Sequence, residues 1–574
     1  MHFIDYSIII TYIIIILLFG ILLRKRASQG INAYFLGGRS VPWWVLGTSG
    51  MASNLDMTGT MLITSFFYII GVKGFLVELR GGVVLLMAFL LVFLGKWYSR
   101  AGVITVAEWM EFRFGKGRQG EAARLLCTIS IILSTVGMIA YFFVGTGKFL
   151  SIFLPFSPTV CALLMISIAL FYTTLSGFYG VVYTDLIQAI LIGFATVFIS
   201  VKAFLAVDLA SIQALTPAGW TDIWPSWRMD MPVGYEMYNL FGISVTFFFL
   251  KTVIEGFGAP GGYMAQRYFA AKSDRDSGLL SAMWIFFLAF RWPFIIGVAI
   301  LGITLGAKVS EPEMVLPTVI IHMIPVGMKG LMIAALIAAA MSTFDSTINA
   351  AASYMVNDIY YKYIRPSATE KQLVYASYVS SILIVVAGVF IGLVTPSINS
   401  IWGWLTMSLV AGMIMPMFLR WYWWRFNGYG FAIGTGVGMI GAIVQRLFFT
   451  SMPEWQAFLM VTSASLVGMI SGTLLTTPTD KKVLENFFKI TKPIGFWGPI
   501  TKFIGADEFQ LIKQENRRDL IALFFAIPWQ ISLFLTPVFV VIHKWDSVSI
   551  SLSILIISTI GLYLFWYRYL DDSQ

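Results

Sequence analysis

The stretch Ala52-Ser53-Asn54-Leu55-Asp56-Met57-Thr58-Gly59-Thr60 lies at the centre of an apolar segment, 43–71, that is long enough to cross a bilayer. Its polar residues and its glycine weaken the helical hydrogen-bond ladder. Unwound backbone is tolerated inside a membrane only where it lines a cavity or is buried in protein. We therefore predict a broken helix whose interruption faces a binding site.

A second interruption, Phe257-Gly258-Ala259-Pro260-Gly261-Gly262, lies in the segment 237–266, five apolar segments further along the chain. Breaks in corresponding positions of two halves are the sequence sign of inverted repeats with a binding site at the membrane midplane. Glycine clusters also allow close helix packing, which is the simpler interpretation of either break alone. Because the two breaks match, we expect a five-plus-five inverted repeat.

The whole chain has the composition of a membrane protein. Of its 574 residues, 58% are hydrophobic and 12% are charged, and a soluble domain carries about 25% charged residues. Apolar stretches of roughly 20 residues, the length that spans a bilayer, predict an all-α polytopic membrane protein. We count fifteen of them, at 5–23, 43–71, 74–97, 123–150, 158–178, 180–204, 237–266, 279–306, 327–350, 370–394, 397–423, 429–450, 454–476, 519–541 and 546–567.

The distribution of basic residues predicts that the N-terminus is outside and the C-terminus inside. Loops on the cytoplasmic side of a membrane are enriched in Lys and Arg. With this orientation the inner loops and ends hold 27 of the 38 Lys and Arg residues, the outer ones hold 8, and Arg80, Lys251 and Arg291 lie within spans. Since these basic residues lie in short loops between apolar segments, the net charge of +9 does not indicate nucleic-acid binding.

The spans divide the chain into four parts. We expect an extra N-terminal span at 1–26, five-helix repeats at 43–204 and 237–423, and four additional spans in 429–574 with a cytoplasmic loop at 477–518. No loop is long enough for a soluble catalytic domain, and no nucleophile–base set is evident, so we expect no enzyme. Both cysteines fall within predicted spans, which argues against a disulfide framework or a metal site.

One glycine motif imitates a nucleotide site. The run Gly436-Val437-Gly438-Met439-Ile440-Gly441 matches the dinucleotide-binding pattern, but it lies inside an apolar span with no strand before it. We interpret it as a helix-packing surface.

The ninth span carries a cluster of hydroxyl groups. Ala339, Ser342, Thr343 and Ser346 follow one another at i, i+3, i+4 and i+7, which places them on one helical face. Hard cations such as sodium prefer oxygen ligands. Two hydroxyls together with carbonyls from an unwound helix would supply them. Hydroxyls in membrane helices also bond their own backbone, so both interpretations remain open.

Buried acids outnumber buried bases in the predicted spans. An isolated charge in lipid is costly, and such residues face a cavity or a partner. Pairing with the three bases leaves a surplus of two negative charges, which a bound cation or protonation would satisfy. The five acids are Asp56, Glu78, Asp185, Glu255 and Asp345.

Arg80 allows two interpretations. It lies two residues after Glu78 near the outer end of its span, where it would snorkel to the surface or pair with Glu78 or another acid. Alternatively, its planar donor fork meets a carboxylate or ring hydroxyls of the substrate. The second interpretation favours a sugar acid over a neutral hexose.

Four motifs together resemble the sodium/solute symporter family, which includes sodium/glucose, sodium/proline, sodium/iodide and sialic acid transporters. The resemblance implies the inverted-repeat fold of LeuT-type transporters, preceded by one extra helix. It also implies alternating access driven by inward sodium, in the inner membrane of a bacterium. The motifs are Gly38-Arg39-Ser40-Val41-Pro42-Trp43-Trp44, Tyr183-Thr184-Asp185-Leu186-Ile187-Gln188, Gln266-Arg267 and Ser342-Thr343…Asn349…Asn357-Asp358-Ile359-Tyr360.

The resemblance also implies a sodium site, made of the Ala52, Leu55 and Ala339 carbonyls and the Ser342 and Thr343 hydroxyls. The run Asp56-Met57-Thr58-Gly59 resembles a motif of the proline transporters two residues out of register, so either register fits the two carbonyls of the broken helix.

A second sodium site is implied at Asp185, with Asp345 and Ser346 in the matching positions. Asp345 stands where the family pattern has a serine, and both one and two sodium ions per cycle remain compatible with the sequence.

For the substrate, the resemblance implies that Glu78 contacts sugar hydroxyls and that Tyr263 is an inner gate. The substrate-facing candidates are Asp56, Gly59, Glu78, Arg80, Tyr263 and Trp404. Gly59 and Trp404, or a neighbour such as Trp402, replace amides of the sugar transporters.

The sequence therefore predicts a sodium-coupled symporter that imports a small polar solute, a sugar or sugar acid being favoured. Its expected partners are sodium, the solute and the lipid bilayer, with no obligate protein partner. An amino acid or monocarboxylate symporter, a transporter-like membrane sensor and a proton-coupled exchanger using Asp56 and Asp345 are the alternatives.

Overall fold

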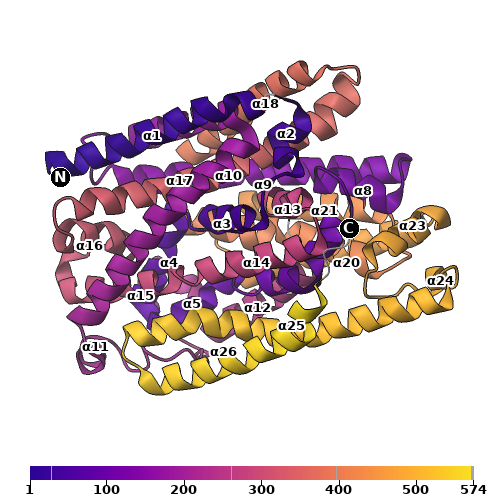
Figure 1. The fold of residues 1–574 in the computed structure, drawn as a ribbon. Helices are drawn as coiled ribbons and strands as arrows, with labels where there is room; N and C mark the ends of the chain where they lie inside the picture. The colour runs from indigo at the N-terminus through magenta and orange to yellow at the C-terminus, as the bar shows by residue number, and fades with distance from the viewer. Residues whose placement is uncertain (28, 260, 396, 571–574) are drawn as a thin grey trace.

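The computed structural model describes residues 1–27, 29–259, 261–395 and 397–570, and within them it contains helices and no β-strand. Pro260 of the predicted second interruption and residues 571–574 of the predicted C-terminal part lie outside the described residues. The long helices run roughly side by side, with α1 and α18 along one edge of the molecule and α25 and α26 along the opposite edge (Figure 1).

The first half of the chain forms α1 (Phe3–Ala27), α2 (Ile31–Leu36), α3 (Trp43–Asn54), α4 (Met57–Ile70), α5 (Gly74–Val77), α6 (Leu86–Phe89), α7 (Gly95–Ser99), α8 (Val106–Phe114), α9 (Arg118–Leu150), α10 (Pro158–Ala206), α11 (Leu209–Leu215), α12 (Phe241–Gly258) and α13 (Gly262–Ala270). The second half forms α14 (Asp274–Leu288), α15 (Arg291–Leu305), α16 (Val315–Met323), α17 (Met328–Ser353), α18 (Glu370–Leu393), α19 (Ile398–Trp404), α20 (Ala411–Tyr422), α21 (Gly428–Phe448), α22 (Glu454–Leu475), α23 (Lys481–Thr491), α24 (Gly498–Thr501), α25 (Ala506–Val541) and α26 (Trp545–Phe565). Short stretches of other helix types extend several of these helices, namely η3 (Glu78–Arg80), η4 (Leu90–Leu94), η8 (Tyr354–Ile364), η9 (Leu405–Leu409) and η10 (Tyr567–Tyr569).

In the described residues, 13 helices are long and apolar enough to cross a membrane, which confirms an all-α polytopic membrane protein. Three of the fifteen predicted spans account for the different count. The candidates 158–178 and 180–204 are the two arms of the bent helix α10, which counts once, and 74–97 divides into a piece that continues α4 and the shorter helix Leu86–Ser99.

Glycines lie at both points. Within α10, Gly177 has φ 52° and ψ −153°, a conformation that separates the helix into two arms. In the third predicted span, the chain turns at Gly81-Gly82, where a Cβ on Gly81 would overlap the side chain of Thr406. Helix breaking at these points depends on what packs against the glycine, because glycine only permits the bend.

Both predicted interruptions are present. The first lies between α3 and α4, where Leu55 has ψ 59° and the Asp56 side chain caps α4 by accepting a hydrogen bond from the Gly59 amide. The second lies between α12 and α13, where Ala259 has φ 62°. Each membrane-crossing segment is therefore split into two short helices near its middle.

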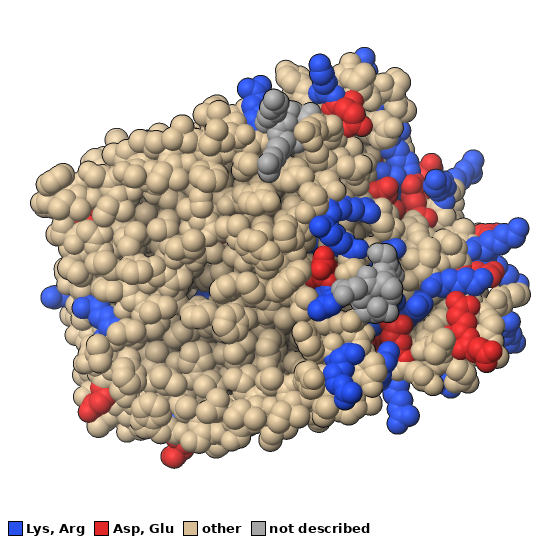
Figure 2. Space-filling model, viewed as in Figure 1, with Lys and Arg blue, Asp and Glu red and all other residues tan. Residues whose placement is uncertain are grey.

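Charged side chains are unevenly distributed over the surface. On the face shown in Figure 2, Lys, Arg, Asp and Glu gather at the end of the molecule where α8, α23 and α24 lie, and few appear at the opposite end. The surface between the two ends shows few charged side chains (Figure 2). The exposed apolar side chains of the protein include Ile190, Phe390 and Phe524. This is the surface expected of a protein that contacts lipid along its middle.

The glycine motif of α21 is a packing surface, as predicted. A Cβ on Gly438 would overlap the carbonyl oxygen of Gly412 in α20, so the two backbones are in direct contact. Gly436, in the same motif, has Leu126 as its nearest neighbour at 3.7 Å from the position of an added Cβ.

The contact gives a matched pair of variants. We expect Gly438→Ala to lower the free energy of unfolding by about 1–3 kcal/mol, the usual cost of overpacking, because neither backbone can move without separating two helices. Gly436→Ala, which meets only ordinary contact, should leave stability unchanged. Thermal unfolding of the purified variants in detergent measures the difference, and equal midpoints for the two would contradict this packing.

Candidate functional site

A cavity of about 110 Å³ lies where the two interrupted segments meet. It is lined by polar residues from the first interruption, by the turn after Glu78, and by side chains of α9, α12, α13, α15, α17 and α19. Its walls include four predicted substrate-facing residues and one predicted sodium ligand. The lining residues are Ser53, Asn54, Asp56, Gly59, Leu62, Ile63, Glu78, Gly81, Gly82, Val83, Leu86, Met138, Tyr141, Glu255, Tyr263, Met264, Arg291, Thr343 and Trp402.

Carboxylates, one guanidinium and aromatic rings face this cavity. Glu78 accepts a hydrogen bond from Arg291 at 2.9 Å. Asp56 caps α4 and accepts a longer bond from the Tyr141 hydroxyl at 3.4 Å. The ring of Tyr141 lies 5.0 Å from that of Trp402. Such a site offers charged acceptors, donors and a flat apolar surface to one small ligand.

Tyr263 lies at the edge of this cavity in contact with the first interruption. Its hydroxyl accepts a hydrogen bond from Asn54 at 2.7 Å, and Asn54 in turn accepts one from Trp284 at 2.8 Å. The end of α3 is thereby tied to α13 and α14 next to the break. Tyr263 therefore lines the cavity, and its role as an inner gate stays a prediction.

Two predicted substrate-facing residues lie outside the cavity lining. The guanidinium of Arg80 is fully buried and bonds Glu454 at 2.6 Å and Asn399 at 2.8 Å, together with the Tyr238 hydroxyl. The sequence left several interpretations of Arg80 open, and the structure shows an ion pair with another acid, Glu454. Trp404 donates to the Ala442 carbonyl at 3.0 Å, and its neighbour Trp402 lines the cavity instead.

Other lining residues had not been assigned from the sequence. Arg291 was identified only as a basic residue within a span, and Tyr141 carried no local signal. Gly81-Gly82 was visible as a glycine pair directly after the Glu78–Arg80 turn, and it allows the chain to bend beside Trp402. This glycine pair is the feature of the sequence from which this wall of the cavity could have been located.

The predicted sodium ligands lie together between α17 and the end of α3. Thr343 donates to the Ala339 carbonyl at 3.1 Å, and Ser342 donates to Asp185. The Ala52 carbonyl accepts from the Leu55 amide at 3.2 Å as α3 ends. Helices α3 and α17 pack against one another, so five oxygens named from the sequence belong to one buried region.

Arg267 is the centre of the region predicted to hold a second cation. Its Nη2 donates to the hydroxyls of Ser49 and Ser53, both at 2.7 Å, and to that of Ser346 at 2.8 Å. It also lies 3.6 Å from the Asp185 carboxylate, and both residues are fully buried. A positive charge supplied by the protein itself therefore lies among the predicted cation ligands.

Asp345 lies beside this cluster without a positive partner of its own. One carboxylate oxygen accepts from the Tyr172 hydroxyl, and the other is buried with no hydrogen-bond partner in the described part of the chain. Ser346, the next residue, bonds Ser53 at 2.7 Å. Asp185, Asp345 and Ser346 are thus brought together, as the sequence analysis anticipated.

The surplus of two buried negative charges can now be assigned to residues. Asp56 and Asp345 make no ion pair within the described ranges. The other three acids have cationic partners, namely Glu78 with Arg291, Glu255 with Lys251 and Asp185 with Arg267. Arg267 was not among the three bases counted from the sequence, and the third of those bases, Arg80, pairs with Glu454 instead. Of the two unpaired acids, Asp56 faces the cavity and Asp345 faces the Arg267 cluster.

Comparison with known proteins matches this chain to a symporter family and to sodium-coupled symporters. The model of the sodium:solute symporter family matches residues 34–438. The sodium/glucose cotransporter of Vibrio parahaemolyticus is 26% identical over 495 residues, covering 80% of this chain and 87% of that protein. The sodium/sialic acid symporter SiaT of Proteus mirabilis is 27% identical over 458 residues, covering 77% and 85%.

Among solved structures, a Na+-coupled sialic acid symporter in a substrate-bound outward-open state is similar with a TM-score of 0.69 at 20% identity. The similarity covers 83% of this chain and 99% of that one. At this identity the likeness establishes the fold, and it supports the arrangement of broken helices described above.

The Asp185–Arg267 pair yields a double-mutant test. Removing either partner leaves a buried uncompensated charge, which costs about 3–5 kcal/mol, so we expect Asp185→Asn and Arg267→Gln each to lower the unfolding midpoint strongly. The double variant should recover part of that loss, because both charges are then absent. Its uptake should still lack normal sodium dependence.

Thermal unfolding of the three variants measures their stability losses, and uptake at several sodium concentrations measures the sodium dependence of the double variant. Strictly additive stability losses would show that the two residues do not interact.

Proposed function

The chain belongs to the sodium:solute symporter family, and we propose that it imports a sugar or a sugar acid into a bacterial cell by alternating access. The end of the molecule rich in Lys and Arg is assigned to the cytoplasm, since basic residues favour that side of a membrane. The repeats at 43–204 and 237–423 would move against one another around the cavity, and the extra spans at 1–26 and 429–574 would flank them.

The observation that carries this proposal is the composition of the cavity. Asp56 and Glu78 offer acceptors for hydroxyl groups, and Trp402 offers a flat face of the kind that stacks on a sugar ring. Arg291 lines the same cavity, and its Nε is buried without a hydrogen-bond partner in the described residues. A guanidinium in this position suits a carboxylate, so Arg291 takes the role that the sequence had offered to Arg80.

The two sites share structural elements, and this sharing explains coupling. Thr343 belongs to the predicted sodium ligands and also lines the cavity, and the first interruption contributes to both. A sodium ion held by Thr343, Ser342 and the carbonyls near residues 52–55 would order the backbone that forms one wall of the solute site. Each ligand then favours the conformation that the other needs, which is the basis of reciprocal coupling.

A second cation is proposed at Asp185, Asp345 and Ser346. Asp345 supports this because its carboxylate has no ion pair in the described residues. Arg267 bonds Ser346 and lies beside Asp185 in this structure, so its guanidinium would neutralise Asp185 when sodium is absent and would have to move away as the cation binds.

The sodium assignment can be tested with hydroxyl deletions in α17. The variant Ser342→Ala with Thr343→Ala should raise the sodium concentration for half-maximal uptake at least tenfold, because two of the proposed ligands are lost. Ser353→Ala, further along α17, removes a hydroxyl that bonds only the Ala350 carbonyl, and should leave the requirement unchanged. Radiolabelled uptake by proteoliposomes measures the requirement. A double variant with the sodium dependence of the unaltered protein would remove these residues from the site.

The solute assignment can be tested by comparing two arginines with sialic acid and glucose as probes. If Arg291 binds a carboxylate, Arg291→Gln should raise the apparent KM for sialic acid at least tenfold, about 1.4 kcal/mol or more, with a smaller effect on any glucose uptake. Arg80→Gln should lower thermal stability with little change in KM, because Arg80 pairs with Glu454. If the KM effects were reversed, Arg80 would be the contact residue.

A further inference from the structure

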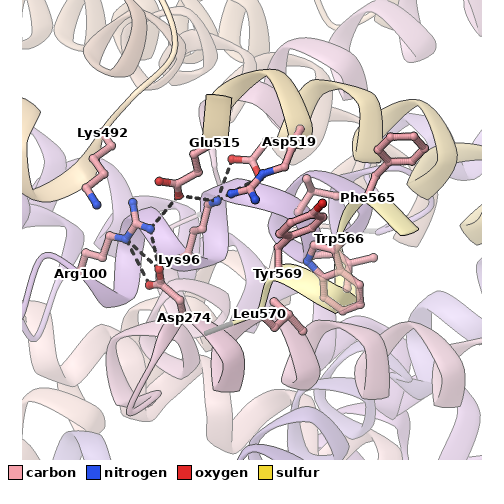
Figure 3. Close-up of a pocket in the computed structure, with 14 residues that line it drawn as sticks. Lys96, Arg100, Asp274, Lys492, Glu515, Asp519, Phe565, Trp566, Tyr569 and Leu570 are labelled. Carbon is pink, nitrogen blue, oxygen red and sulfur yellow. Dashed lines mark hydrogen bonds and ion pairs between the residues drawn. The ribbon is translucent and has the colours of Figure 1, made fainter. Parts of the chain in front are cut away.

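A second polar cavity, of about 230 Å³, lies at the charged end of the molecule, apart from the solute cavity. Four apolar segments meet here, namely Leu86–Ser99, Asp274–Lys308, Ala506–Val541 and Trp545–Tyr569. The lining includes Arg100, Asp274 and Tyr569, which lie at or next to the ends of three of them, so the cavity lies where the membrane core gives way to water. Its lining residues are Leu91, Val92, Lys96, Arg100, Asp274, Gly278, Lys492, Glu515, Arg518, Asp519, Phe565, Trp566, Tyr569 and Leu570 (Figure 3).

All three carboxylates of this cavity are already engaged. Lys96 contacts Glu515 and Asp519, both at 2.8 Å. Arg100 contacts Asp274 at 2.6 Å and Glu515 at 2.8 Å. Two cations therefore account for every acid, and Figure 3 shows these ion pairs as one continuous network along one wall.

Two further cations, Lys492 and Arg518, make no ion pair in the part of the chain that the structure describes. The Arg518 guanidinium lies over the Tyr569 ring at 4.0 Å, a contact that uses the face of the guanidinium, whereas anions bind at its N–H edge. The Lys492 side chain is directed toward Arg100 (Figure 3). Like charges facing one cavity repel each other, and an anion among them would remove that repulsion.

The remaining wall is apolar. Leu91, Val92, Phe565, Trp566 and Leu570 face the same space as the cations. Tryptophan and tyrosine near the end of a span are typical of the membrane interface, where one end of a ligand is apolar and the other is wet. The cavity thus combines four cations against three carboxylates with one apolar wall.

We propose that this cavity binds a phosphate group, with Lys492 and Arg518 as its principal ligands. The apolar wall favours the phosphate of an anionic phospholipid over free inorganic phosphate, since basic pockets between spans recognise lipid head groups in this way. Because α25 and α26 lie beyond residues 34–438, such a lipid would join these additional helices to α7 and α14 of the family core.

The test uses the full chain in detergent and three probes: dioctanoyl phosphatidylglycerol, dioctanoyl phosphatidylcholine and inorganic phosphate. We expect phosphatidylglycerol to raise the thermal unfolding midpoint in a saturable manner, with little effect of phosphatidylcholine. The variant Lys492→Gln with Arg518→Gln should need at least a tenfold higher phosphatidylglycerol concentration for half the shift. Its midpoint without lipid reports whether it folds.

The matched control is Lys482→Gln with Lys513→Gln, which removes the same charge from two exposed positions outside the cavity. This control should respond to phosphatidylglycerol like the unaltered protein. If inorganic phosphate alone saturates the shift and the cavity variant loses it, the site stands and free phosphate is its ligand. If the cavity variant and the control respond to phosphatidylglycerol and to phosphate as the unaltered protein does, the proposal is overturned.

Discussion

A helix that stops inside a membrane exposes carbonyl and amide groups that no water can reach, and each must find a partner within the protein. At the end of α12 the Gly258 carbonyl accepts from the Trp421 indole at 3.0 Å, and the Phe257 carbonyl accepts from the Tyr422 hydroxyl at 2.8 Å. At the start of α4 the Asp56 carboxylate accepts a hydrogen bond from the Gly59 amide. These partners satisfy backbone groups that the two breaks leave free next to the cavity.

Buried charges obey the same constraint and bind distant parts of the chain together. The Glu78–Arg291 pair joins the first half of the family core to the second, and Arg80–Glu454 joins the core to an additional helix. Arg113 has no acid partner in the described ranges, and instead lies against the rings of Phe114, Phe487 and Trp497 while donating to carbonyls at the end of α20. Buried pairs of this kind give specificity of arrangement more than net stability.

Much of the fold could be predicted from the sequence because membrane insertion is decided locally. Each span needs only an apolar stretch of sufficient length, and each interruption is a short polar or glycine-rich run. The chain bends at Gly177, between the predicted spans 158–178 and 180–204, and at Gly81-Gly82, inside the predicted span 74–97, and packing decides whether such a permitted bend is used. Tyr34 lies against Gly177, and Trp402 and Thr406 lie against Gly81, and none of these neighbours is close in sequence.

The candidate site, like the fold, could be predicted in part from the sequence. By itself the sequence determined which residue types are present, that buried acids exceed buried bases, and that hydroxyls share one face of α17, because these properties follow from composition and helical period. Only the tertiary structure decided which buried acid pairs with which buried base. Arg80 finds its acid 374 positions away, and Arg291 finds Glu78 213 positions away. Composition cannot choose among such pairs, because every buried base is chemically competent to meet every acid, and only packing of the helices brings one pair within hydrogen-bond distance.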